Sequence, residues 1–77
     1  MNKQRKKSIE KIIEQIMKLN ENIEEVLWEE EDAYDNIPEN LQESERARIS
    51  EESIDLLTEA KDYLVDANDS LSSILDL

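Results

Sequence analysis

Apolar residues recur along the first half of the chain at alternating steps of three and four positions. The row consists of Ile9, Ile12, Ile16, Leu19, Ile23 and Val26, and after an interruption at Glu30 it continues with Ala33 and Ile37. Steps of three and four place side chains on one face of an α-helix, and a repeat of seven residues is typical of helices that pack against a neighbouring helix. The pattern predicts an amphipathic helix over about residues 3–36.

The same alternation returns in the second half of the chain. Its members are Leu57, Ala60, Leu64, Ala67, Leu71 and Ile74, and Ile54 and Ala47 extend the row toward the middle less regularly. This pattern predicts a second helix over about residues 44–76. Because both halves have helical spacing, and the chain has no Gly and only one Pro to form the turns of a sheet, we expect an all-α fold.

The segment between the two rows contains the break signal. Pro38 disfavours helical geometry at Ile37, so the first helix is expected to end there. Ser44, which precedes a glutamate, is a candidate N-cap of the second helix, and Ser50 is a second candidate if that helix starts later. We therefore expect a turn over about residues 37–43.

The two rows are compatible with an antiparallel hairpin. In such a hairpin, the numbers of residues that face each other across the seam add to a constant, and the pairs from Ile9 with Ile74 to Val26 with Leu57 all add to 83. The centre of this register falls inside the expected turn. Three of the pairs place a large residue opposite a smaller one, which favours close packing. The sequence thus predicts a single domain over residues 1–77, a coiled-coil-like helical hairpin.

Apolar residues outside this seam indicate a further contact surface. A chain of this size buries little surface, and hairpins commonly gain stability by pairing into helical bundles, so we expect a homodimer or a larger homo-oligomer. Residues beside or opposite the predicted seam form the expected partner interface: Leu27, Trp28, Tyr34, Leu56 and Tyr63. Trp28 is equally compatible with a self-interface and with an interface to a different protein.

The charge of the chain points to a second kind of partner. The sequence has 21 acidic and 9 basic residues, for a net charge of −12, and six of the basic residues lie in residues 1–18. The acidic remainder should repel nucleic acids and anionic membranes and attract basic proteins. An alternative function is therefore that of an acidic inhibitor that occupies a basic, nucleic-acid-binding surface of another protein.

The composition argues against catalysis and against ligand sites. The chain has no Gly, Cys or His, which removes phosphate-binding loops, most metal ligands and the usual base of a serine nucleophile. The acidic run over residues 29–35 lacks the glycine of a calcium-binding loop. We therefore expect no enzyme activity, cofactor, metal or small-molecule ligand. The absence of cysteine and of a long apolar run favours a cytoplasmic protein that does not bind membranes.

The middle of the chain carries a resemblance. Residues 31–46 read EDAYDNIPENLQESER between a helix with a basic start and an acidic helix. This arrangement resembles small uncharacterised acidic helical proteins encoded by phages and mobile elements of bacteria. The resemblance spans nearly the whole chain and assigns no site residues. It implies a bacterial cytoplasm, an accessory role, and a host or defence protein as the target of the alternative inhibitor function.

Overall fold

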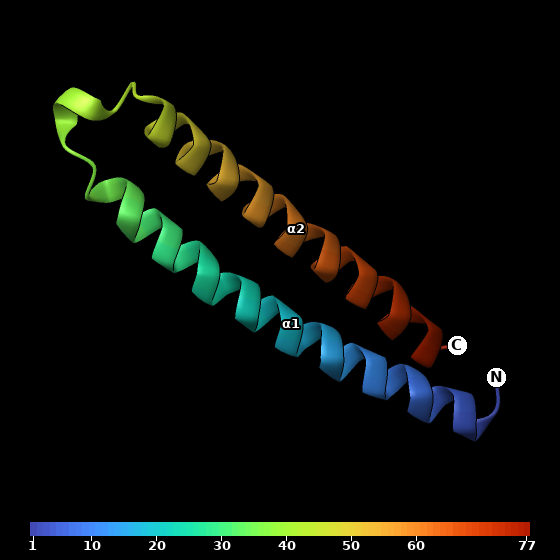
Figure 1. The fold of residues 1–77 in the computed structure, drawn as a ribbon. Coiled ribbons are helices and arrows are strands. Elements are labelled where there is room, and N and C mark those ends of the chain that lie inside the picture. The colour runs from blue at the N-terminus through green and yellow to red at the C-terminus, as the bar shows by residue number, and fades with distance from the viewer.

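The computed structural model describes all 77 residues and shows a hairpin of two long helices (Figure 1). Helix α1 spans Lys3–Asp35, the short 3-10 helix η1 spans Glu39–Leu41, and helix α2 spans Glu45–Leu75. The helices lie side by side in opposite directions, so both termini lie at the end of the hairpin away from the turn. The molecule measures 59 × 15 × 14 Å. The expected all-α fold with two packed helices is confirmed.

Local capping interactions explain where each helix begins. Asn2 precedes α1, and its side-chain Oδ1 accepts a hydrogen bond from the backbone N–H of Arg5 at 2.8 Å. Ser44 precedes α2 in an extended conformation, and its Oγ accepts a hydrogen bond from the backbone N–H of Ala47 at 3.2 Å. Both side chains satisfy backbone donors that have no partner within the helix. Ser44 is therefore the N-cap, and the later candidate, Ser50, lies buried within α2.

The turn is organised around Ile37 and Pro38. Pro38 has an extended backbone (φ −54°, ψ 143°), and its carbonyl accepts a hydrogen bond from the N–H of Leu41 at 2.8 Å, which closes η1. Gln42 Nε2 donates a hydrogen bond of 2.8 Å to the carbonyl of Ile37. The Ile37 side chain is buried. The turn is therefore fixed by an apolar anchor and by side-chain hydrogen bonding, without any residue at positive φ.

Two side-chain contacts fix the register between the helices. Asn68 Nδ2 donates a hydrogen bond of 3.4 Å to the carbonyl of Ile13, and Lys61 Nζ lies 3.3 Å from Glu24 Oε2. The residue numbers add to 81 and 85, which bracket the expected constant of 83. The helices are therefore antiparallel in nearly the expected register.

The composition of the seam on α1 differs from the expectation. The central row of Ile9, Ile16, Ile23 and Glu30 is half-buried, as expected. Its companion row, however, is Ile13, Asn20, Leu27 and Tyr34, all of which are buried or half-buried. The prediction that Ile12, Leu19, Val26 and Ala33 line the seam was wrong, because these four residues are exposed. Helix α1 is rotated about its axis toward the other flank of its central row.

Helix α2 shows a matching departure. Leu57, Leu64 and Leu71 are half-buried as expected, whereas Ala67, which was predicted in the seam, is exposed. Lys61 and Asn68 are half-buried in its place.

The most deeply buried residues lie toward the turn end of the hairpin. Ala47 is 0% exposed, and Leu27, Ile37 and Ser50 are also buried, so three of the four buried residues lie at or just after the turn. In the observed register, Ala47 and Ser50 lie level with about residues 36 and 33, where α1 ends.

Candidate interaction surface

Each helix carries a row of large apolar side chains that the hairpin leaves in solvent. On α1, Ile12, Leu19 and Val26 are 42%, 51% and 51% exposed and follow one another at seven-residue steps. On α2, Ile49, Leu56 and Tyr63 are each more than half exposed and have the same spacing. Seven residues make almost two full helical turns, so each row runs along one side of its helix.

The two rows lie on the same face of the hairpin. The exposed row of α1 follows the central seam row by three positions. On α2, Ala60, Ala67 and Ile74 follow the row of Leu57 by the same step, and Leu56 and Tyr63 lie one helical turn before Ala60 and Ala67. When two right-handed helices are antiparallel, equal steps from the seam rotate to the same side. A groove of about 390 Å³ confirms this placement near the turn, because Ala33 and Ile49 both line it.

We call this surface the apolar face. It comprises Ile12, Leu19, Val26 and Ala33 of α1, and Ala60, Ala67 and Ile74 of α2 with Ile49, Leu56 and Tyr63 along the α2 edge.

The opposite side of the seam is polar. A second groove, of about 290 Å³, is lined mainly by polar residues, and its lining consists of Met17, Asn20, Glu21, Glu24, Val65, Asn68 and Asp69. The side-chain oxygens of Asn20 and Asn68 are buried there without a hydrogen-bond partner. The ion pair of Lys61 with Glu24 belongs to the same side. This side of the hairpin thus carries more polar and charged groups than the apolar face, although Met17 and Val65 are exposed on it.

The five residues expected at a partner interface occupy three different environments. Leu27 is 7% exposed, and the prediction that it lies outside the seam was wrong because α1 is rotated toward it. Tyr34 is half-buried at the seam. Leu56 and Tyr63 are exposed on the edge of the apolar face, and Trp28 is 59% exposed away from that face.

Sequence reasoning missed the α1 half of the apolar face. Ile12, Leu19 and Val26 were assigned to the seam because they alternate with the central row at steps of three and four. The residues one position later, including Ile13 and Leu27, fit the same steps equally well. The sequence does show that α1 has more apolar rows than one seam can cover. The spacing of these rows does not show which of them stays exposed.

Trp28 lies among carboxylates. It lines a shallow groove of about 230 Å³ together with Glu21, Glu24 and Glu25. Only Glu24 of these acids has an ion-pair partner on the other helix, Lys61. The indole thus offers an apolar ring and an N–H donor within an acidic surrounding.

Tyr63 has a hydroxyl that is held by its own helix. The Oη donates a hydrogen bond of 2.7 Å to Glu59 Oε1. This hydrogen bond, followed by repulsion from the charge of Glu59, raises the pKa of Tyr63 because both favour the neutral phenol. The ring therefore remains uncharged at neutral pH and adds apolar surface to the edge of the apolar face.

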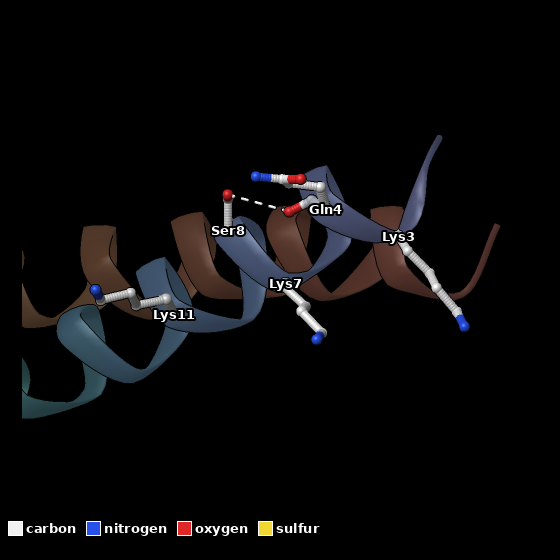
Figure 2. A pocket seen from close by; sticks show the side chains of 5 residues that line it. All are labelled: Lys3, Gln4, Lys7, Ser8 and Lys11. Carbon is white, nitrogen blue, oxygen red and sulfur yellow. Dashed lines mark hydrogen bonds between the residues drawn. The ribbon is translucent and has the colours of Figure 1, made fainter.

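The start of α1 forms a basic surface (Figure 2). An open depression of about 540 Å³ is lined by Lys3, Gln4, Lys7, Ser8 and Lys11 and contains no apolar residue. Ser8 Oγ donates a hydrogen bond to the carbonyl of Gln4 at 3.2 Å. The sequence places this cluster beside the acidic end of α2, but Lys61 with Glu24 is the one ion pair between the helices. No direct ion pair therefore joins this basic surface to the acidic end of α2.

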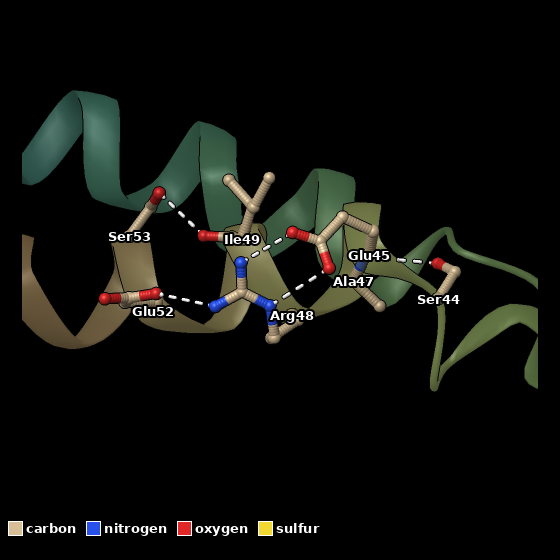
Figure 3. A network of polar contacts seen from close by, with 7 residues as sticks. All are labelled: Ser44, Glu45, Ala47, Arg48, Ile49, Glu52 and Ser53. Atoms are coloured by element: carbon tan, nitrogen blue, oxygen red, sulfur yellow. Dashed lines mark hydrogen bonds and ion pairs between the residues drawn. The ribbon is translucent and has the colours of Figure 1, made fainter.

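A polar network stabilises the first turns of α2 (Figure 3). Arg48 donates to Glu45 at 2.6 and 3.2 Å and to Glu52 at 3.1 Å. Hydrogen bonding from Arg48 lowers the pKa of Glu45, and the same interaction raises the pKa of Arg48. All three residues belong to one helix, so this network supports α2 locally and does not form a binding site.

The hairpin was also compared with metal sites, with membrane-spanning helices and with known proteins. No three acidic side chains converge in an arrangement suited to a metal ion. Neither helix contains a stretch that is both apolar and long enough to cross a bilayer. Comparison with protein-family models, with curated proteins and with solved structures found no match to the chain.

Proposed function

We propose that the chain is a non-catalytic helical protein-interaction module that acts as a homo-oligomer. The observation that carries this proposal is the apolar face, where large side chains from both helices gather in solvent on one side of the hairpin. Contiguous exposed apolar surface in a small protein is typical of an interaction site. On the opposite side, the exposed apolar residues Met17 and Val65 are separated by the polar residues Asn20 and Asn68.

The dimensions of the apolar face suit a second copy. A face of 59 × 15 Å has an outline of about 900 Å², close to the roughly 800 Å² per partner of a standard protein interface. Two hairpins that pack these faces together form a four-helix bundle. Only four of the 77 residues are buried in the single hairpin. Burying the exposed half of a leucine or isoleucine contributes about 1 kcal/mol each, so association enlarges a small core.

The test measures oligomeric mass in two matched variants. Leu19 lies on the apolar face and is 51% exposed, whereas Met17 lies on the polar side of the same helix and is 56% exposed. Light scattering should give an oligomeric mass for the wild-type chain and for Met17→Lys. Leu19→Lys should be monomeric, with its helical circular dichroism retained. A wild-type chain that stays monomeric and folds cooperatively, or equal effects of the two substitutions, would contradict the proposal.

A second candidate function is the acidic inhibitor of a basic protein in a bacterial cytoplasm. It is supported by the net charge of −12 and by Trp28, which is exposed among Glu21, Glu24 and Glu25 outside the apolar face. An exposed tryptophan with an acidic rim suits an arginine-bearing surface, because its ring attracts cations and its neighbours pair with them.

Affinity capture with Trp28→Ala tests this candidate, and Met17→Ala serves as the matched control. A basic nucleic-acid-binding protein should be retained by the wild-type chain and by the control and lost with Trp28→Ala. The captured protein should then release its nucleic acid when the chain is added. A capture pattern that is unchanged by Trp28→Ala would exclude the role of this surface.

A further inference from the structure

We infer that two copies pack their apolar faces with the hairpins pointing in opposite directions, so that Arg5 of each copy lies beside Glu29 and Glu30 of the other. This inference rests on the proposed self-association and adds its geometry. It commits the apolar face to a second copy of the same chain as its occupant.

Twofold symmetry allows two ways to join the same face of two elongated hairpins. With the axis along the hairpins, both turns lie at the same end, and α1 of one copy faces α2 of the other. With the axis across the hairpins, the turns lie at opposite ends, and each helix faces its own equivalent in the reverse direction. We call this second bundle the opposite-end arrangement. Neighbouring helices are antiparallel in both bundles, so helix direction alone does not distinguish them.

Charge distinguishes the two arrangements. The turn end, residues 29–52, contains ten acidic and two basic residues, whereas the terminal end, residues 1–18 with 66–77, contains six basic and five acidic residues. Joining two turn ends would place two strongly acidic surfaces against each other. The opposite-end arrangement places each acidic turn against a terminal end with a slight excess of positive side chains. Electrostatic complementarity therefore selects the opposite-end arrangement.

The exposed row of α1 is also suited to meeting itself in reverse. It consists of Arg5, Ile12, Leu19, Val26 and Ala33, which are evenly spaced with Leu19 in the middle. Reversal about this residue places Ile12 opposite Val26 and Leu19 opposite itself. It places Arg5 opposite the small side chain of Ala33, which leaves room for the guanidinium.

The charged ends of this row lack partners within one hairpin. Arg5 forms no ion pair, and neither do Glu29 and Glu30, which lie one helical turn before Ala33 on α1. Glu30 is half-buried, although its carboxylate interrupts an otherwise apolar row. A guanidinium from the second copy would supply the planar, multidentate donor that carboxylates favour.

The same reversal accounts for exposed residues of α2. The interhelical contacts of Ile13 with Asn68 and of Glu24 with Lys61 place Leu19 level with about residue 64. Reversal about that level brings Leu56 of one copy near residue 72 of the other, and Tyr63 near residue 65. The exposed row of α2 is then covered by α2 of the second copy.

Cross-linking between single-cysteine variants tests the arrangement, since the chain has no cysteine of its own. Ser8→Cys and Glu29→Cys form the first pair, and Gln15→Cys and Ser70→Cys form the second. All four positions are exposed and polar and border the apolar face without belonging to it. The two variants of a pair are mixed, treated with a short bis-maleimide and analysed by mass spectrometry, and each variant alone is the control.

The opposite-end arrangement predicts a cross-linked heterodimer between residues 8 and 29 and none between residues 15 and 70. In the alternative arrangement, residues 8 and 29 are about 31 Å apart along the bundle, whereas residues 15 and 70 face each other. A product of the second pair alone, or a dimer without either product, would overturn the inference and leave self-association standing. A monomeric mass for the wild-type chain would overturn both.

Discussion

Replacing Leu27 by Ala measures how much the observed seam contributes to stability. The Leu27 side chain is 7% exposed, whereas its neighbour Val26 is 51% exposed. Replacing a buried leucine by alanine leaves a cavity and lowers the free energy of unfolding by about 2–5 kcal/mol. In a layer of only two helices, surrounding side chains can close part of this cavity, which reduces the loss. We therefore expect Leu27→Ala to lower the free energy of unfolding by about 2–3 kcal/mol.

Val26→Ala is the matched control. Half of the Val26 side chain is already in solvent, so the lost burial is about 0.8 kcal/mol, and the higher helix propensity of Ala offsets most of it. Its net effect on an isolated hairpin should stay below about 0.5 kcal/mol.

Urea unfolding followed by circular dichroism distinguishes the two positions. Unfolding is measured at protein concentrations where light scattering gives a monomeric mass. It is then measured again at concentrations where light scattering gives an oligomeric mass. In the monomer, Leu27→Ala should be the more destabilising substitution. In the oligomer, the cost of Val26→Ala should rise, because the apolar face is then covered. A monomer in which Val26→Ala costs as much as Leu27→Ala would refute the observed seam.

Three further predictions follow from individual polar groups. Ser50 Oγ is buried without a hydrogen-bond partner, so Ser50→Ala should raise the free energy of unfolding by about 1 kcal/mol. If urea unfolding instead gives a lower free energy of unfolding for this variant, the hydroxyl has a partner. Ser44→Ala should lower it by about 1 kcal/mol through loss of the N-cap of α2, whereas Ser72→Ala, at an exposed position, should have little effect in the same assay. The pKa of Glu45 is lowered in the folded chain by Arg48, so its stabilising contribution is present above the unfolded pKa and is lost as the pH falls through the folded pKa. Helicity should hold from pH 7 to about 5, because weaker repulsion among carboxylates favours the helices, and only the local support that Arg48 gives to α2 should be lost at lower pH; circular dichroism that shows marked loss already at pH 5 would contradict this.

The helices and the turn could be predicted because local signals in the sequence agree there. Pro38 disfavours helix at one position, and Ser44 caps a helix that starts one residue later, so two independent signals delimit the same segment. The register between the two helices could be predicted for a different reason. Once the turn is short and its centre is known, the facing levels of two straight helices follow from their equal rise per residue.

The rotation of each helix about its axis could not be predicted in the same way. Ile12 and Ile13 both lie beside the central row of Ile9 and Ile16, and the spacing of apolar residues treats them alike. The choice depends on the opposite helix, where Asn68 donates a hydrogen bond to the carbonyl of Ile13 and Lys61 pairs with Glu24. These contacts join residues more than 30 positions apart and involve polar side chains that belong to neither apolar row.

The residues misassigned to the seam also explain why the hairpin has a surface to offer. Helix α1 carries three adjacent apolar rows, represented by Ile12, Ile16 and Leu27, and one neighbouring helix can cover only two adjacent rows. Whichever way α1 turns, one row faces solvent. An α1 designed only to pair with α2 would need two rows, as in a simple coiled coil. The third row therefore has no partner within the hairpin, and this exposed row is the part of α1 on which the proposed self-association rests.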